Sequence, residues 1–190
     1  MVHPLEKFQF CPRCGSSSFE EHDFKSKRCN KCNFIYYFNP SAATVAVIIN
    51  ENHELLVCRR AHDPAKGTLD LPGGFVDMNE TIEEGMIREI NEELGARAVI
   101  ERFLFSLPNT YFYAGFTVHT VDCFFLCHLR KGDCIKAMDD ADAFYWISAE
   151  KICPEEFGLN SIRKGVERLL TDDLALLKSN EESFNSSGFL

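Results

Sequence analysis

The sequence predicts an α+β domain built on a mixed sheet, preceded by a small metal-binding module at the amino end. Strand-like apolar runs outnumber the helical segments and alternate with them, which is typical of this class. Four cysteines stand in two close pairs before the first long apolar run. A chain of 190 residues has room for one core of ordinary size and one such module.

Composition excludes several other classes of protein. Hydrophobic residues at 45% and charged residues at 26% exclude a disordered chain, a collagen and a coiled coil. The net charge of −9 repels phosphate backbones, so general nucleic-acid binding is disfavoured. The longest apolar run, residues 42–49, is too short to cross a membrane, and the first residues lack a signal-peptide pattern. We therefore expect a cytoplasmic protein.

The amino-terminal cysteines have the spacing of a metal site. Cys11 and Cys14 form one C-x2-C pair, and Cys29 and Cys32 form another after 14 intervening residues. Four thiolates suit a tetrahedral zinc ion, and four protein ligands leave no open position, so this zinc would be structural. Two disulfides are the alternative, which a reducing compartment disfavours. We expect residues 1–38 to form a zinc ribbon that depends on the metal because its core is small.

The rest of the chain divides into short elements. A domain is expected over residues 39–178 and a loose polar tail over 179–190. Ala43–Ile49 and Leu55–Arg60 predict a hairpin, joined by a turn at residues 50–53. The other expected strands are Val99–Ser106, Val118–Leu129 and Phe144–Ile147. The expected helices are Thr81–Leu94 and Asn160–Leu170, and residues 171–178 are expected to extend the second helix.

The first helix carries three acids on one side. Glu89, Glu92 and Glu93 fall within an arc of about 100° beside the apolar stripe. Three crowded carboxylates repel each other unless a cation neutralises them, and oxygen ligands suit Mg2+ or Mn2+. Gly85 lies in the same arc and would leave room for a metal-bound group. An acidic surface helix is the alternative. The expected apolar stripe is Ile82, Met86, Ile87, Ile90 and Leu94.

The order of residues around this helix resembles a known motif. From Gly74 the chain runs GFVDMNETIEEGMIREINEELGA. This resembles the Nudix box, G-x5-E-x7-R-E-U-x-E-E-x-G-U, where U is a bulky aliphatic residue. Only Ala96 departs from the motif. The preceding LLVCRR and KGTLDLPGG and the later WIS are also similar to the family pattern over about residues 42 to 170. The resemblance implies the family's α/β/α sandwich around a mixed sheet.

The resemblance also implies an activity and roles. Nudix enzymes hydrolyse a nucleoside diphosphate linked to another group, by attack of water on a phosphorus of the pyrophosphate. By resemblance, Glu89, Glu92, Glu93 and the Gly74 carbonyl would bind the Mg2+ or Mn2+ ions. Arg88 would orient a glutamate, and Glu80 would brace the loop. The residues Arg59, Arg60 and Lys66 offer a positive rim for substrate phosphates, or are ordinary surface charges.

The general base is expected outside the box. In many family members it is an acid shortly before the tryptophan of the W-x-S strand, and the matching position here is Ala143, which cannot serve. We favour Asp142 as the base, with Asp139, Asp140 and Glu89 as alternatives.

The zinc ribbon and the entry through Phe38-Asn39-Pro40 resemble the NADH pyrophosphatase branch. That branch carries S-Q-P-W-P-F-P-x-S after the box, whereas this chain has SLPNTYFYAGF from Ser106 to Phe116. Tyr111, Phe112 and Tyr113 would stack on a base or fill the core. The candidate substrates are ADP-ribose, NADH, nucleotide sugars and nucleoside triphosphates, which the sequence does not separate.

Two other functions are compatible with the sequence. One is a Nudix-like sensor that binds a nucleotide without hydrolysis, although every carboxylate of the box is present. The other is a nucleic-acid-binding regulator that acts through the zinc ribbon, which the nearly neutral ribbon disfavours. The family also forms homodimers, on which this sequence carries no signal.

Overall fold

The computed structural model describes residues 3–172, except 131, 134 and 136–140 and the side chains of 141 and 142. The predicted tail and the proposed helix extension beyond 172 lie outside these residues. The chain divides into two compact units, Met1–Pro40 and Ser41–Leu190, which are described separately. Within the described residues, no helix combines the length and the hydropathy needed to cross a membrane.

The amino-terminal unit is a small antiparallel sheet. Its strands are β1 (Phe19–Asp23), β2 (Ser26–Cys29) and β3 (Ile35–Tyr37), in the order β1-β2-β3. Among its described residues, the apolar cluster buries Phe19, Cys11 and Cys29, with Cys32 and Phe34 partly buried against them. Because so little apolar surface is buried, this fold needs a cross-link or a metal to be stable.

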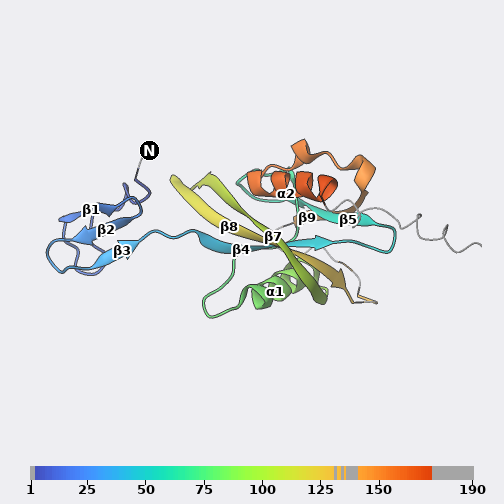
Figure 1. Ribbon diagram of the computed structural model, residues 1–190, viewed down its shortest axis with the longest axis horizontal. Coiled ribbons are helices and arrows are strands. Elements are labelled where there is room, and N and C mark those ends of the chain that lie inside the picture. The colour runs from blue at the N-terminus through green and yellow to red at the C-terminus, as the bar shows by residue number, and fades with distance from the viewer. Residues whose placement is uncertain (1–2, 131, 134, 136–140, 173–190) are drawn as a thin grey trace, which may run out of the picture. The chain divides into compact units, whose positions relative to one another are not determined.

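The second unit contains two three-stranded sheets (Figure 1). In the first, of order β4-β8-β7, β4 (Ser41–Ile48) runs parallel to β8 (Phe116–Leu129), which is antiparallel to β7 (Ala98–Tyr113). In the second, of order β6-β5-β9, all pairs are antiparallel; its strands are β5 (Glu54–Arg60), β6 (Leu69–Asp70) and β9 (Ala141–Ser148). The predicted α+β class with a mixed sheet is confirmed.

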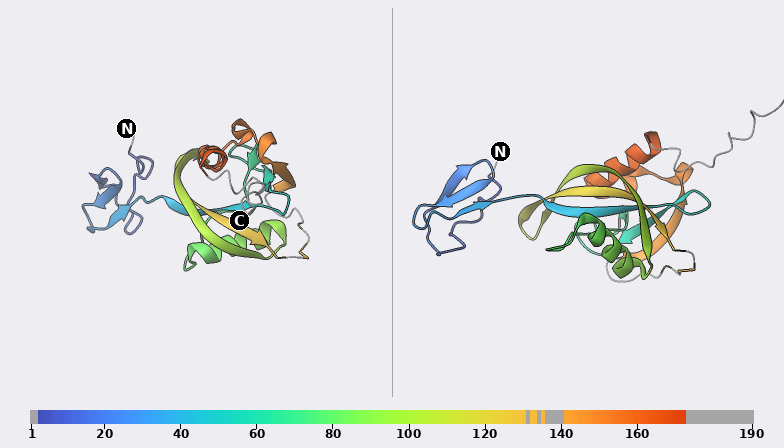
Figure 2. Two further views of the ribbon diagram at one scale, coloured as in Figure 1. Left: turned by 45° about the vertical axis from the view of Figure 1, so that its right-hand side comes forward. Right: turned by 60° about the horizontal axis from the view of Figure 1, so that its bottom comes forward.

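Two helices lie on opposite sides of the first sheet (Figures 1 and 2). Helix α1 (Ile82–Leu94) packs on one face through Met86, Ile90 and Leu94, with Ala46 and Phe125 across the interface. Helix α2 (Asn160–Thr171) covers the other face. Its contacts there include Ile162, Val166 and Leu169 on the helix and Val45, Val47 and Phe124 on the sheet. The alternation along β4 thus supplies one residue to each core in turn. Short helices η1 (Ala149–Lys151) and η2 (Pro154–Glu156) precede α2.

The predicted hairpin of β4 and β5 is wrong in its pairing. These strands belong to different sheets and share only the isolated bridge between Ile49 and Leu55. The reason is that the free edge of β4 is occupied by the loop after β6. The Thr44 N–H donates to the Gly74 carbonyl (2.8 Å), and the Ala46 N–H donates to the Pro72 carbonyl (2.7 Å). This pairing fixes the loop that leads into α1 against the central strands.

The sequence underestimates the length of β7. The strand continues past Ser106 to Tyr113 with Pro108 inside it, opposite Val121. Proline is tolerated there because β7 is an edge strand of its sheet, where an N–H donor can be spared. The extension adds Asn109, Tyr111 and Tyr113 to the first sheet, where they pair with β8.

Candidate functional site

Helix α1 begins one residue after its predicted start at Thr81 and ends at Leu94 as predicted. Thr81 is the N-cap, and its side chain accepts from the Glu84 N–H while the Glu84 side chain accepts from the Thr81 N–H. Gly95 ends the helix at φ 61°. Its apolar stripe is narrower than predicted, because Ile87 is 45% exposed and Ile82 only partly buried. The helix therefore has well-defined ends, which fix where its acids project.

Arg88 joins the loop to the helix. Its Nε and Nη2 donate to the two oxygens of Glu80 (2.7 and 3.0 Å), and Nη2 also donates to the Phe75 carbonyl (2.9 Å). Its Nη1 donates to Glu89 (2.8 Å) and to Glu92 (2.9 Å). All five donors of a guanidinium can be used in this way, which a lysine could not reproduce. Arg88 is the centre of a network of three carboxylates.

This network shifts the pKa of Glu80. The hydrogen bonds from Arg88, with one from the Asp77 N–H, lower the pKa of Glu80 to about 2. Glu89 behaves differently: burial raises its pKa, and the Arg88 guanidinium opposes the rise. The carboxylate of Glu80 thus stays ionised over a wide pH range.

The structure does not gather the three acids of α1 around one point. Glu89 and Glu92 both pair with Arg88, whereas Glu93 Oε2 accepts from the Gly73 N–H (3.0 Å). Among the described side chains, these three do not form a group of ligand atoms within 4.8 Å of one another. The physical reason is that Arg88 supplies the positive charge that the sequence assigns to a metal ion. Glu92 is half exposed, with 51% of its side chain in solvent, so its carboxylate is free to turn toward a cation.

Gly85 does not leave room for a metal-bound group. A Cβ at this position would lie 3.2 Å from Glu80 Oε2 and 3.4 Å from Val76 Cγ2. The loop before the helix fills the space that the sequence predicts for a ligand. The glycine therefore allows close packing of loop and helix.

The donors around the loop fit a hard divalent cation. The candidate donors are the carboxylates of Glu89, Glu92 and Glu93 and the carbonyl of Gly74, and all offer oxygen, which Mg2+ and Mn2+ prefer. The Gly74 carbonyl accepts from the Thr44 N–H (2.8 Å) and, at 3.4 Å, from the Thr44 hydroxyl, so a cation at this oxygen would take the place of the long hydroxyl contact. The absence of a side chain on Gly74 lets the Glu89 carboxylate lie against the loop backbone.

A cavity of about 590 Å³ opens beside this loop. Its lining includes Gly73, Gly74 and Glu93 on one side, and Asn109, Tyr111 and Asp122 from β7 and β8. This volume is within the range of small-molecule sites. Of the three predicted acids, only Glu93 lines the cavity. The cavity thus connects the acidic helix to a recess that the sequence analysis did not identify.

The cavity floor holds buried polar groups that sequence reasoning missed. Asp70 and Asp122 are 6% and 4% exposed, and Asn109 and Thr120 are also buried. Burial raises the pKa of Asp70, and the paired guanidinium of Arg60 opposes the rise. A charged residue in the middle of the apolar run Val118–Leu129 was the available signal for Asp122.

The three basic residues predicted to form a positive rim for substrate phosphates do not all line the cavity. Arg60 lines the cavity, but its guanidinium pairs with Asp70 and donates to the Pro64 carbonyl (2.7 Å). Arg59 donates to the Gly67 carbonyl (2.6 Å) and is not part of the lining. Lys66 is exposed and is also absent from the lining among the described residues.

The favoured general base, Asp142, is described only in its backbone. Asp139 and Asp140 lie outside the described residues, as does the side chain of Asp142. The β9 backbone at this point is opposite the bulge between Arg59 and Arg60, where Arg60 pairs with Ala141.

The four amino-terminal cysteines come together in space. Their sulfur atoms all lie within 4.8 Å of one another, and the Cys11–Cys32 and Cys14–Cys29 sulfurs are each 3.7 Å apart. A disulfide has sulfurs about 2.05 Å apart. A tetrahedral zinc with bonds of about 2.3 Å holds its sulfurs about 3.8 Å apart. The spacing of the four thiols therefore fits a zinc ion, and neither of these two pairs lies at disulfide distance.

Comparison with known proteins identifies the family. The family model described as the NUDIX domain matches residues 39–169. The chain belongs to the Nudix family. The fold agrees, because a Nudix hydrolase from Nitrosomonas europaea superposes with a TM-score of 0.69 at 25% identity, covering 85% of this chain and 90% of that one. The predicted Nudix fold is thus confirmed.

Two kinds of Nudix relative are similar in sequence. An ADP-ribose pyrophosphatase from Methanocaldococcus jannaschii is 36% identical over 134 residues, which are 70% of this chain and 72% of the relative. The NAD-capped RNA hydrolase NudC of Vibrio vulnificus is 27% identical over 56% of this chain. The chain spans only 40% of that protein's length.

Proposed function

We propose that this Nudix hydrolase cleaves the pyrophosphate bond of a nucleoside diphosphate linked to a second group, with ADP-ribose as the first candidate. The observation that carries the proposal is that Glu93 belongs to both parts of the site. It accepts from the Gly73 N–H of the loop, and it lines the cavity of about 590 Å³. A nucleotide in the cavity would therefore have its phosphates beside the acidic helix. The 36% identical ADP-ribose pyrophosphatase supports the choice of substrate.

The carboxylates of Glu89, Glu92 and Glu93 and the Gly74 carbonyl would hold Mg2+ or Mn2+. When bound, such an ion screens the phosphate oxygens and lowers the pKa of a bound water. Arg88 is a positioning residue, since its hydrogen bonds tie Glu89 and Glu92 to Glu80 and to the loop backbone. This arrangement holds Glu89 against the loop before the substrate arrives, and the half-exposed carboxylate of Glu92 would turn from Arg88 toward the cation.

Asp142 is the proposed general base, which takes a proton from the attacking water. Two observations support Asp142. It lies four residues before Trp146, and its backbone lies opposite Arg59 and Arg60 on the neighbouring strand, where Arg60 lines the cavity. Glu89 is the alternative base, because it lies against the loop at Gly74 and burial raises its pKa above the ordinary value. Near-normal turnover by Asp142→Asn would exclude Asp142.

NADH or a related dinucleotide is a second candidate substrate. It is favoured by the aromatic rings of Tyr111 and Tyr113, which line the cavity, and by the resemblance to the NADH pyrophosphatase branch. The cysteine cluster would hold a structural zinc, as that branch implies. Phe112, the third predicted aromatic, is 69% exposed.

A substrate panel tests the proposal. We expect wild-type protein with Mg2+ or Mn2+ to release AMP from ADP-ribose or NADH, as measured by ion-exchange chromatography. Glu92→Gln and Glu93→Gln should lose most of this activity. Glu83→Gln is the matched control, because Glu83 is an exposed acid in the first turn of the same helix. Tight binding of ADP-ribose without turnover of any substrate would favour the nucleotide sensor and contradict the proposal.

A further inference from the structure

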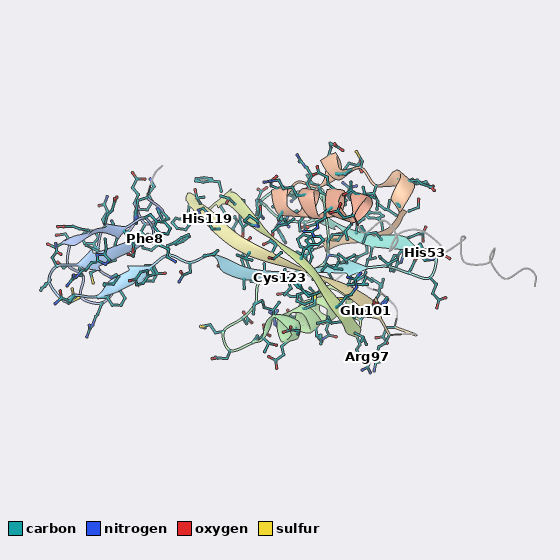
Figure 3. The ribbon with its side chains drawn as sticks, viewed as in Figure 1. Phe8, His53, Arg97, Glu101, His119 and Cys123 are labelled. Carbon is teal, nitrogen blue, oxygen red and sulfur yellow. The ribbon has the colours of Figure 1, made fainter. Side chains whose placement is uncertain are left out.

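Asp122 presents a buried carboxylate that forms no ion pair with any described residue. It lies in the middle of β8, next to Cys123, which is labelled in Figure 3. Its two oxygens accept from the hydroxyls of Thr120 and Ser161, each at 2.5 Å. The residue is 4% exposed, and within the described part of the chain it forms no ion pair.

This carboxylate has unused capacity to accept hydrogen bonds. A carboxylate offers about four lone-pair sites, and the two hydroxyls use two of them. Buried charges are costly unless hydrogen-bond donors surround them. Because Asp122 also lines the cavity, a ligand with N–H groups would supply the missing donors.

Asn109 places a donor on the same face of the sheet. Asn109 on β7 lies opposite Thr120 on β8. Asp122 is two residues beyond Thr120 on the same strand, so the side chains of Asn109 and Asp122 are diagonal neighbours on one face of the sheet. The Asn109 Oδ1 accepts from the Thr110 N–H (3.0 Å), so its amide nitrogen remains as a donor. This residue is buried, at 4% exposed, and it lines the cavity as well. The floor thus combines one acceptor and one donor.

The sides of the cavity suit a flat ring. Tyr111, Tyr113 and Phe75 all line it, and Tyr113 and Phe75 are 52% and 47% exposed. Aromatic rings stack on nucleobases of any type, so they provide affinity without selecting a base. Selection must then come from the polar groups of the floor.

We propose that Asp122 and Asn109 select adenine in this cavity. The exocyclic amino group of adenine would donate to Asp122, and its neighbouring ring nitrogen would accept from Asn109. This assignment rests on the proposed function, and it deepens it by naming the residues that would recognise the adenine base of the substrate. Hypoxanthine has a carbonyl oxygen and a ring N–H at these two positions, so the order of donor and acceptor is reversed.

Binding of AMP and IMP tests the assignment, because these nucleotides differ at these positions and contain no pyrophosphate bond to cleave. By calorimetry, wild-type protein should bind AMP about tenfold or more tightly than IMP, the selectivity expected of a paired donor and acceptor. Asp122→Asn should lose most of this preference. Asn109→Asp removes the amide donor but neither of the hydroxyl donors to Asp122, which are Thr120 and Ser161. This variant should therefore also weaken AMP binding.

Asp172→Asn is the matched control, because it removes an exposed carboxylate at the end of α2 and should keep the wild-type ratio. An unchanged ratio in folded Asp122→Asn would overturn the assignment, as would failure of wild-type protein to bind either nucleotide. Equal weakening of both nucleotides would also overturn it, since a sugar contact does not distinguish the bases. AMP selectivity without turnover of any pyrophosphate substrate would support the assignment and contradict the proposed function.

Discussion

Gly74 lies directly against the carboxylate of Glu89. A Cβ atom on Gly74 would fall 2.5 Å from Glu89 Cδ and 2.6 Å from each of its oxygens. No side chain fits into such a space without displacing the carboxylate. The glycine at the start of the box therefore positions the first acid of the helix, in addition to offering its own carbonyl oxygen.

Gly74→Ala should reduce hydrolysis by about 10- to 100-fold, because the methyl group would move the Glu89 carboxylate. The measurement is kcat/KM for ADP-ribose in a double-mutant cycle with Glu89→Gln. We expect the double variant to be no worse than Glu89→Gln alone, since both changes act on one group. Losses that multiply would contradict a role exerted through Glu89.

Arg88→Lys should lower kcat by about 100-fold, because lysine cannot hold Glu80, Glu89 and the Phe75 carbonyl together. Arg97→Lys is the control, since Arg97 pairs with Asp133 at the surface of the same unit. Equal activity of the two variants would show that the network around Arg88 is dispensable.

Glu80 should remain ionised in the folded protein down to about pH 2, compared with an ordinary value of 4.5. Because the folded pKa is depressed, this group contributes stability that is complete above pH 4.5 and is lost as the pH falls toward 2. Carbon-13 NMR of the carboxyl group measures the titration directly. Arg88→Gln should return the midpoint toward the ordinary value, and a wild-type midpoint near 4.5 would refute the pairing.

Purified protein should contain one zinc ion per chain, held by Cys11, Cys14, Cys29 and Cys32. Chelation should unfold the amino-terminal unit and make these four thiols reactive, because the unit buries little apolar surface. Metal analysis and thiol titration provide the readouts. Cys14→Ser should lose the zinc, whereas Cys153→Ser, which changes an exposed cysteine outside the cluster, should retain it. Rapid reaction of all four thiols without chelation would argue against the site.

Gly165→Ala should destabilise the second unit, because a Cβ there would meet ring atoms of Phe124 at 2.4 and 2.5 Å. Overpacking costs more than the helix propensity that alanine gains, so we expect a net loss of about 1–2 kcal/mol in the free energy of unfolding. Urea denaturation tests this against Lys164→Ala, an exposed neighbour that should stay within about 0.5 kcal/mol of wild type.

Local signals predicted the helix of the site well. Although the capping box of Thr81 and Glu84 was not identified from the sequence, the apolar periodicity predicted a helix over Thr81–Leu94, within one residue of the observed bounds. The same holds for the cysteine pairs, whose spacing carries the ligand geometry. The order of Gly74, Arg88 and Glu89 also identified the family without any structure.

Long-range pairing was not predictable in the same way. The edge of β4 can bond to β5 or to the loop at Pro72 and Gly74, and nothing local distinguishes these partners. The recess at Asp122 depends on Ser161, which is 39 residues away. The resemblance predicted that Arg88 orients a glutamate, but the sequence did not show that Arg88 bonds to both Glu89 and Glu92, because its direction depends on the loop.

The most direct test of the central claim is the release of AMP from ADP-ribose by wild-type protein and by Glu93→Gln under identical conditions with Mg2+. Glu93 links the loop to the cavity, so we expect rapid release by the wild type and a loss of at least about 100-fold in the variant. Equal rates in the two proteins would contradict the account of the site.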